Sequence, residues 1–279
     1  KENVAYGEAL DICHSISSPI NRNIKVYSGG FDTVKDADVI ICDAGPSILP
    51  GQYERLKLAK ENVKNITEIM TEVVKYNTDA IFIMITNPLD VTTYLAATKF
   101  GWKHGRLFGT GTTLETLRFK YILSRHFDVN PQDIQGYMLG EHGNSAFPAW
   151  STVSIGGIRL NDLHNYFPEV KLDRELIHKQ VVKTAYEVMD AKGWTNTGIA
   201  SGAIRLAQAV FFDEKAVVPV SVPLTGEYGL KDVALSLPSV VGKDGVEKRL
   251  ALPLPEDELE LLYKSSECIK EVLRASNLI

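Results

Sequence analysis

A histidine between two glycines is the first candidate for chemistry in this sequence. The segment Gly140-Glu141-His142-Gly143-Asn144-Ser145 follows an apolar run, residues 134–139, that predicts a strand. The glycines let the backbone turn sharply and let a ligand approach closely. A histidine exchanges protons near neutral pH, so His142 is a candidate general acid or base. A surface loop that contains a histidine is the competing interpretation.

Charged and amide side chains elsewhere could act with this histidine. Glu115 and Arg118 lie three residues apart and share a helix face, although surface ion pairs show the same spacing. Arg55 falls in the first turns of a predicted helix, where a solvated helix face is the simpler explanation. Asn87 and Pro88 follow a buried-type strand, and they suit the N-cap and the first position of a helix.

Together these residue types match the needs of a 2-oxo acid. Such a substrate requires a cation for its carboxylate, an acid for its carbonyl oxygen and a cation for the developing alkoxide. Arg118, His142 and Arg55 supply these three groups. A carboxylate beside the histidine favours the imidazolium form and raises the histidine pKa, and Glu115 is the candidate.

The elements around these residues predict an α/β protein. Apolar runs at 37–42 and 80–85 resemble strands buried on both faces of a parallel sheet. Their alternation with helices, the first long one over 53–76, indicates a doubly wound sheet. Ligands bind such sheets at the carboxyl ends of the strands, where Gly45 and Asn87 fall.

The pattern changes after residue 111, where we place a domain boundary. Residues 1–111 are interpreted as an incomplete dinucleotide-binding domain and residues 112–279 as a catalytic, substrate-binding domain with antiparallel strands. Helices are predicted over 1–14, 113–127, 173–192, 195–212 and 255–276, and strands over 24–27, 150–158, 217–222 and 233–241, with a hairpin turn at 242–245.

Composition excludes several classes of protein. The 279 residues are 44% hydrophobic and 23% charged with a net charge of -5, so a globular chain is expected without nucleic-acid partners. No apolar run approaches the roughly 18 residues that a membrane helix needs. The cysteines are far apart and the histidines lack metal-ligand spacing, which favours a cytoplasmic protein without disulfides or a metal. The cysteines are Cys13, Cys42 and Cys268.

Six motifs occur in this order and at similar spacings in the L-lactate and malate dehydrogenase family, which the chain resembles from about Glu8 to its C-terminus. They are Asp43-Ala44-Gly45; Glu54-Arg55-Leu56 with Asn62; Thr86-Asn87-Pro88-Leu89-Asp90; Gly109-Thr110-Gly111-Thr112; Leu114-Glu115 with Arg118; and Gly140-Glu141-His142-Gly143. Only together are they specific, and the lactate dehydrogenase branch looks closest. The resemblance implies a Rossmann-type parallel sheet, followed by an α+β catalytic domain.

The resemblance also implies a role for each matching residue. His142 resembles the proton donor to the substrate carbonyl, and Arg118 the residue that holds the substrate carboxylate by two hydrogen bonds. Arg55 resembles the mobile-loop arginine that closes over the substrate and polarises the carbonyl. Asn87 resembles the residue that orients the carbonyl and the nicotinamide.

The cofactor and the assembly follow from the same resemblance. NAD is the implied cofactor, with Ala44, Gly45, Asn87 and Ile199 in contact with it, and Ile199 behind the nicotinamide. Thr195 resembles the threonine beside the substrate methyl group. The family is homo-oligomeric, so a homotetramer or at least a dimer is implied.

The chain departs from the family pattern at two places. Glu115 stands where the family usually has Asp, and the extra methylene shifts the carboxylate, so we expect activity at a reduced rate. The Gly-rich turn of the first strand and the acidic residue about 20 positions later are absent. We therefore expect that a leading segment precedes Lys1.

Substrate choice is expected to depend on the loop before Arg55. Residues 46–50 carry no basic side chain for a second carboxylate, which argues against malate. Ile48 or Leu49 occupies the discriminating position, and an apolar residue there favours an aliphatic 2-oxo acid. Pyruvate is the first candidate; Asn144 resembles the variant of 2-hydroxyisocaproate dehydrogenases, the second candidate. A catalytically silent assembly subunit is the alternative from another class.

Overall fold

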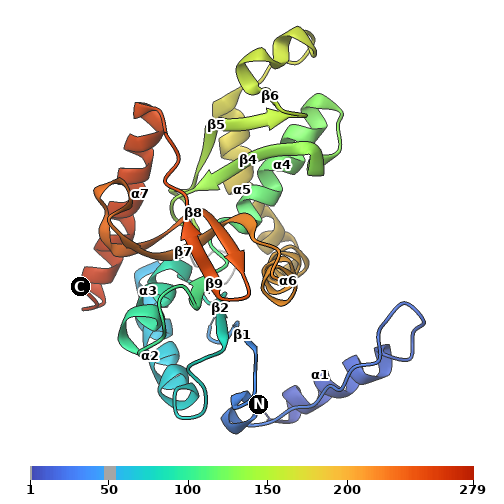
Figure 1. The fold of residues 1–279 in the computed structure, drawn as a ribbon, viewed down its shortest axis with the longest axis vertical. Helices are drawn as coiled ribbons and strands as arrows, with labels where there is room; N and C mark the ends of the chain where they lie inside the picture. The colour runs from blue at the N-terminus through green and yellow to red at the C-terminus, as the bar shows by residue number, and fades with distance from the viewer. Residues whose placement is uncertain (1, 47–54) are drawn as a thin grey trace.

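Two β-sheets organise the chain in the computed structural model, which describes residues 2–46 and 55–279, with side chains from 2–46 and 58–279 (Figure 1). The larger sheet has the order β1-β2-β3-β7-β8-β9, and the smaller one has the order β4-β5-β6. The strands of the larger sheet are β1 (Val39–Cys42), β2 (Ile81–Met84), β3 (Leu107–Gly109), β7 (Ala216–Thr225), β8 (Lys231–Gly242) and β9 (Gly245–Arg249). Those of the smaller sheet are β4 (Ile134–Leu139), β5 (Phe147–Ile155) and β6 (Ile158–Arg159).

The larger sheet is mixed, and the predicted α/β class is confirmed. β1, β2 and β3 are parallel, with Val39 opposite Ile81 and Ile83 opposite Phe108. All four residues of β2 are buried, as expected for a strand covered on both faces. β3 then pairs antiparallel with β7 through Gly109 and Ser221, and β7, β8 and β9 continue antiparallel. One sheet thus runs from the amino-terminal half of the chain into the carboxyl-terminal half.

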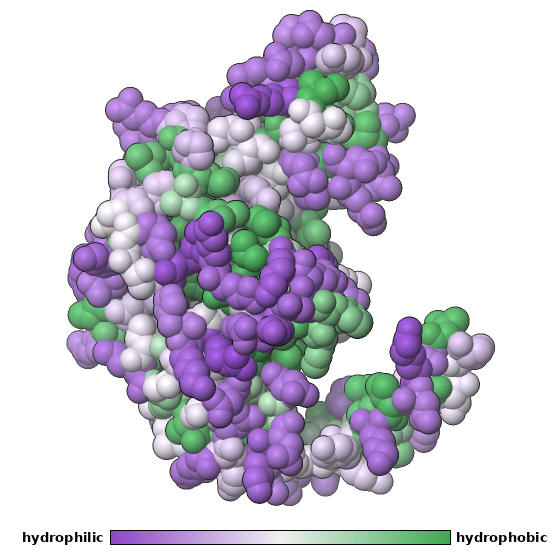
Figure 2. Space-filling model, in the orientation of Figure 1, coloured by the Kyte–Doolittle hydropathy of each residue, from purple (hydrophilic) through white to green (hydrophobic). Residues whose placement is uncertain are grey.

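Helices flank these sheets and connect the parallel strands. In the described part of the chain they are α1 (Glu2–Ser15), α2 (Arg55–Val73), α3 (Leu89–Lys99), α4 (Thr113–Phe127), α5 (Arg174–Lys192), α6 (Thr197–Phe211) and α7 (Glu256–Ala275), with 3-10 turns at Phe31–Val34, Pro131–Asp133, Leu160–Asn165 and Glu227–Gly229. α1 extends away from the rest of the molecule and buries none of its side chains (Figure 1). Figure 2 shows apolar surface along this arm, where Tyr6 and Ile12 are exposed. No described helix is long and apolar enough to cross a membrane.

Two local predictions are wrong. Residues 24–27 form no strand, because a short apolar run has no neighbouring strand to pair with there. The helix predicted to begin at Pro88 begins at Leu89, and Pro88 itself is the N-cap residue, without a side-chain hydrogen bond. Asn87 therefore does not cap the helix, and its carbonyl accepts a hydrogen bond of 2.6 Å from Nδ2 of Asn62.

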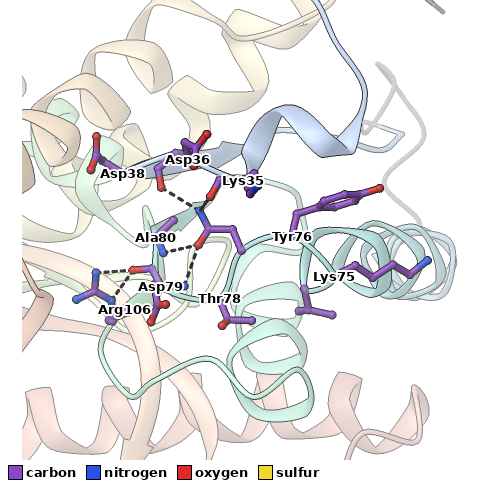
Figure 3. A pocket seen from close by; sticks show the side chains of 12 residues that line it. Lys35, Asp36, Asp38, Lys75, Tyr76, Thr78, Asp79, Ala80 and Arg106 are labelled. Atoms are coloured by element: carbon purple, nitrogen blue, oxygen red, sulfur yellow. Dashed lines mark hydrogen bonds between the residues drawn. The ribbon is translucent and has the colours of Figure 1, made fainter.

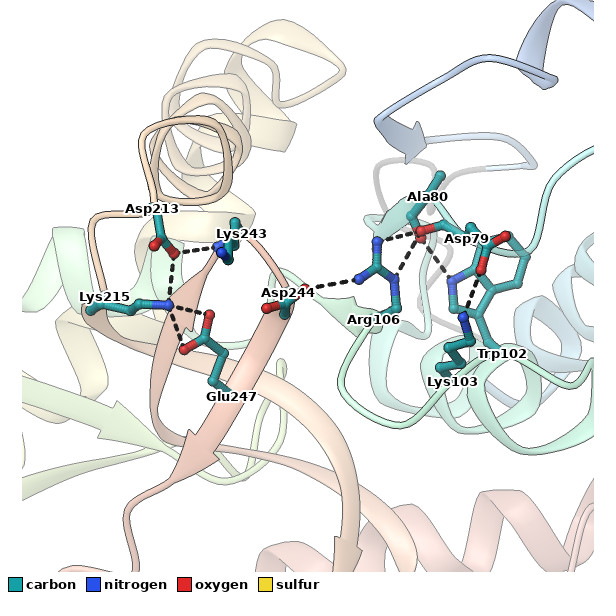
Figure 4. A network of polar contacts seen from close by, with 10 residues as sticks. All are labelled: Asp79, Ala80, Trp102, Lys103, Arg106, Asp213, Lys215, Lys243, Asp244 and Glu247. Carbon is teal, nitrogen blue, oxygen red and sulfur yellow. Dashed lines mark hydrogen bonds and ion pairs between the residues drawn. The ribbon is translucent and has the colours of Figure 1, made fainter.

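Polar side chains hold the amino ends of the parallel strands. Nδ2 of Asn77 donates to the carbonyls of Val34 and Ala37, and Oδ1 of Asn77 accepts from the backbone of Asp79 and Ala80. Asp79, Asn77 and Arg106 are among the residues that line an open pocket at this end of the sheet (Figure 3). The ion pair between Arg106 and Asp244 also joins the β8–β9 hairpin to this end of the sheet, and Lys215, directly before β7, pairs with Glu247 of β9 (Figure 4). These contacts hold the parallel strands in place at their amino ends, and the carboxyl ends of the same strands lie at the other edge of the sheet.

Candidate active site

A cavity of about 410 Å³ opens at the carboxyl ends of β1 and β2. The segments 43–46 and 85–87 line one side of it, and α4 and the turn after β4 line another. α5, the segment leading into α6 and the first turn of α6 close the remaining side. Their lining residues are Val182, Ala185, Tyr186, Met189, Trp194, Thr195 and Ile199. The cavity thus lies where an α/β sheet is expected to bind its ligand.

His142 and Glu115 meet at this cavity. Nδ1 of His142 lies 2.9 Å from Oε1 of Glu115, within ion-pair distance, although the ring N–H is not directed at a hydrogen-bond acceptor. Both side chains are largely buried, with 19% of the histidine and 7% of the glutamate side chain exposed. The longer side chain of Glu115 therefore reaches the histidine, but not in line with its N–H bond.

Arg118 completes a charged triad on the same wall. Its Nη1 lies 3.8 Å from the Glu115 oxygen that faces the histidine, at the outer limit of an ion pair. With its side chain 14% exposed, the guanidinium remains able to form hydrogen bonds to a ligand in the cavity. Glu115 and Arg118 share a face of α4, as their spacing predicts.

The electrostatic balance favours a protonated histidine. Burial alone lowers the pKa of His142, but the nearby carboxylate of Glu115 and then that of Asp90 outweigh it, so the pKa is raised. For Glu115, burial raises the pKa, and the opposing charges of His142 and Arg118 outweigh it, so the pKa is lowered. The pair consequently favours imidazolium beside carboxylate.

Glycine is required at the turn that delivers the histidine. Gly140 has φ +88°, and a Cβ there would lie 2.5 Å from Oγ of Ser265. The backbone of Gly140 pairs with Ser236 of β8 through two hydrogen bonds, 3.1 and 2.9 Å long. The close approach of the backbone to α7 and β8 is thus possible only without a side chain.

Glu141 and two serines fix the other side of this turn. Ser145 donates to the buried carboxylate of Glu141 from both its backbone N–H and its hydroxyl. Oγ of Ser265 on α7 accepts from the Glu141 N–H at 2.8 Å and lies 2.9 Å from Oγ of Ser145. These bonds form a closed ring that ties the turn to α7.

The segments after β1 and β2 let a ligand approach the backbone closely at one position. Gly45 has φ +124°, and a Cβ there would lie 2.2 Å from Oδ1 of Asn62. Asn62 is fully buried, and its Nδ2 donates to the carbonyls of Pro46 and Asn87, which joins the two segments. A ligand can therefore approach the backbone closely at Gly45, where no side chain stands.

The structure brings together eight of the side chains or positions expected from sequence. His142, Glu115, Arg118, Asn87, Ala44, Gly45, Thr195 and Ile199 all line the cavity. Arg55 begins α2, but its side chain is outside the described residues. Ile48 and Leu49 also lie outside the described residues.

Several residues at the site were not anticipated from the sequence. Asp90 accepts a 2.7 Å hydrogen bond from the backbone N–H of His142, although 52 positions separate them. Tyr186 lines the cavity and donates to Oδ1 of Asn144 at 2.6 Å, and Trp194 also lines the cavity. Asp90 belongs to the motif at residues 86–90, but no local pattern indicates its partner.

Comparison with known proteins defines the class. A family model described as the NAD binding domain of lactate/malate dehydrogenase matches residues 1–109, and one described as the alpha/beta C-terminal domain of the same family matches residues 112–277. An L-lactate dehydrogenase of Selenomonas ruminantium is 46% identical over 274 residues, which are 98% of this chain and 86% of that protein. L-lactate dehydrogenase 2 of Clostridium acetobutylicum is 41% identical over 278 residues, covering 99% and 87%.

Solved structures agree with the sequence relatives. The crystal structure of minor L-lactate dehydrogenase from Enterococcus mundtii, in a ligands-bound form, superposes with a TM-score of 0.92 at 34% identity. The match covers 98% of this chain and 87% of that one. Fold and site define a dehydrogenase with a Rossmann-type nucleotide-binding half. The chain belongs to the lactate/malate dehydrogenase family, and it is an NAD-dependent L-2-hydroxy acid dehydrogenase.

Proposed function

We propose that this enzyme reduces a small aliphatic 2-oxo acid to the L-2-hydroxy acid, with pyruvate and L-lactate as the first candidate pair. The observation that carries the proposal is the convergence of His142, Glu115 and Arg118 on one cavity next to Asn87. An anion-binding guanidinium, a proton donor and a carbonyl-orienting amide are the groups that reduction of a 2-oxo acid requires. Relatives of this enzyme in Selenomonas ruminantium and Clostridium acetobutylicum are L-lactate dehydrogenases, which supports the same substrate class.

Each of these side chains has a distinct task in the proposed reaction. Arg118 holds the substrate carboxylate, and its planar guanidinium suits a two-point contact. Nδ1 of His142 faces Glu115, which leaves Nε2 to donate a proton to the carbonyl oxygen. The bound dinucleotide supplies the hydride. Arg55, at the start of α2, is assigned to the developing negative charge on that oxygen.

The raised pKa of His142 predicts a pH dependence. Reduction needs the imidazolium form, so the rate is full below the histidine pKa and is lost as pH rises through it. Glu115→Gln removes the carboxylate that holds this pKa up, and the loss of rate then moves to lower pH. The measurement is kcat/KM for reduction against pH. Glu175→Gln, at an exposed ion pair on α5, should leave the profile unchanged, and a Glu115→Gln profile like the parent's would refute the pairing.

The residues of the cavity wall support an aliphatic 2-oxo acid over a dicarboxylic one. Arg118 is the only Arg or Lys among the described residues that line the cavity, so a second carboxylate has no cation there. Val182, Met189 and Trp194 provide an apolar wall for an aliphatic substituent. We expect kcat/KM to be much lower for oxaloacetate than for pyruvate or 2-oxo-4-methylpentanoate. NADH oxidation with the three acids tests this, and a preference for oxaloacetate would contradict it.

The ratio of the two aliphatic acids separates the remaining candidates. A larger kcat/KM with 2-oxo-4-methylpentanoate identifies a branched-chain 2-hydroxy acid dehydrogenase, the second candidate, whose larger substituent the apolar wall can also contact. Absence of turnover with all three acids would contradict the proposed substrate class and favour the alternative of a silent assembly subunit.

We further propose that the enzyme is a homo-oligomer, because Ile204 and Phe211 of α6 are exposed on the described chain. Light scattering of the purified protein measures its mass. A cytoplasmic location is proposed on different grounds, namely the three cysteines without a disulfide partner.

A further inference from the structure

A buried carboxylate lies directly behind the histidine turn. Asp90 is 1% exposed and sits in the first turn of α3. Its Oδ2 accepts from the backbone N–H of His142 at 2.7 Å, and its Oδ1 accepts from the hydroxyl of Ser221 on β7 at 2.6 Å. Asp90 is not among the residues that line the substrate cavity.

A charge at this depth requires compensation. A buried carboxylate is strongly unfavourable unless hydrogen bonds and nearby positive charge or dipoles stabilise it. Here the amino end of α3 provides a favourable dipole, and His142 and Ser221 provide N–H and O–H donors. An uncharged side chain such as asparagine could also join α3 to the His142 turn and β7. The presence of a buried negative charge at this position therefore needs a separate explanation.

The position of Asp90 in the chain links both sides of the active site. Asn87, on the nucleotide side of the cavity, precedes Asp90 by three residues, and α3 begins between them. The opposite wall begins at His142, which Asp90 holds through its backbone. Ser221 lies in β7 opposite Gly109 of β3, so the same carboxylate is also attached to the central sheet.

We propose that Asp90 is a positioning residue, which clamps the His142 turn to α3 and β7 and thereby fixes where the histidine presents its proton to the substrate carbonyl. The proposal rests on the function proposed above. Glycine leaves the conformation of the turn free to vary. Hydrogen bonds to Ser236 and Ser265 hold Gly140 and Glu141, and the bond from the His142 N–H to Asp90 adds a constraint on the histidine itself. Misplacement of a catalytic group by about 1 Å can reduce the rate a hundredfold.

The negative charge of Asp90 also favours the protonated form of His142, which is the form that donates the proton. Burial and, more weakly, the charge of Arg118 lower the pKa of His142. Glu115 opposes them most strongly, and Asp90 adds to this opposition, so the pKa is raised. Asp90 therefore supports the imidazolium from the backbone side, while Glu115 supports it from Nδ1.

Two substitutions separate the hydrogen bonds from the charge. Asp90→Asn keeps the shape and can still accept from His142 while donating to Ser221, but it removes the charge. A neutral amide oxygen accepts the His142 N–H more weakly than a carboxylate does, so the turn is held less firmly. We expect kcat for reduction to fall by about tenfold or more, with the loss of rate at high pH shifted to lower pH and NADH affinity unchanged. Ser221→Ala keeps the charge and removes one anchor, so kcat should fall by a smaller factor with an unshifted profile. Asp79→Asn, at the opposite end of β2, is the matched control and should resemble the parent.

Outcomes that contradict the clamp are equally clear. If Asp90→Asn lowers only the melting temperature, with parental kcat and pH profile, Asp90 is a structural residue and the proposal fails. If Asp90→Asn does not fold, parental kcat in Ser221→Ala rejects the clamp. A titration of the His142 ring by NMR needs no turnover, so it distinguishes this proposal from the proposed function. A lower ring pKa in Asp90→Asn shows that the charge of Asp90 acts on the histidine, even in a chain without activity. An unshifted ring pKa overturns the part assigned to the charge.

Discussion

His142→Ala lowers kcat for 2-oxo acid reduction by about 10²–10⁴-fold, the usual contribution of a positioned general acid. NADH affinity stays at the parental value, because the nucleotide-side segments at Gly45 and Asn87 do not depend on the imidazole. Stopped-flow reduction of pyruvate, with NADH binding followed by fluorescence, measures both quantities. The reason for the size of the effect is that no other described side chain at the cavity combines a ring nitrogen with a supporting carboxylate.

The control for this variant is an exposed histidine away from the cavity. His164 lies in the 3-10 turn Leu160–Asn165, and its Nδ1 is 2.8 Å from the carbonyl of Asn161. His164→Ala should have the kinetics of the parent. Retention of parental kcat in His142→Ala would show that the proton comes from another group, and the assignment of the active site would be wrong.

Arg118→Lys raises KM for the 2-oxo acid by about 10–100-fold. Lysine keeps the positive charge but offers one nitrogen, so the two-point contact with a carboxylate is lost. A hydrogen bond between charged groups contributes about 1.5–3 kcal/mol, which corresponds to this range. The nearby carboxylate of Glu115 also attracts the ammonium group away from the ligand, since the Arg118 side chain already lies 3.8 Å from it. Initial rates at varied pyruvate concentration and saturating NADH give KM.

The matched control for this variant is on the same helix. Arg125 lies near the end of α4, with its guanidinium carbon 5.4 Å from the centre of the Tyr121 ring. Arg125→Lys should leave KM unchanged. If Arg118→Lys also leaves KM unchanged, the substrate carboxylate must be bound by a different residue.

Much of the fold was predictable because it is encoded locally. The apolar periodicity of residues 113–127 gives the bounds of α4, and the buried run at 80–85 contains β2. The failures arose where local signals compete. Asn87 carries good capping chemistry, but its segment faces the cavity and the helix begins after Pro88.

The candidate site was predictable in its residue types but not in its geometry. Motif order places His142 and Glu115 in one site, but only the folded chain gives their distance and the direction of the N–H bond. Asp90 is separated from His142 by 52 positions and from Ser221 by 131, so its partners depend on tertiary structure. A sequence pattern contains no information on such contacts without a template for the fold.

The continuity of the larger sheet limits how this enzyme can be recombined. β3 and β7 pair through Gly109 and Ser221, so a cut near residue 111 separates two segments that share one hydrogen-bonded sheet. Residues 1–109 grafted onto an unrelated protein would expose the β3 edge to solvent. Bare edges of this kind recruit strands from other chains, so such chimeras should aggregate. A graft that keeps β7, β8 and β9 with the first half leaves β3 paired with β7 and exposes no edge that the intact sheet covers.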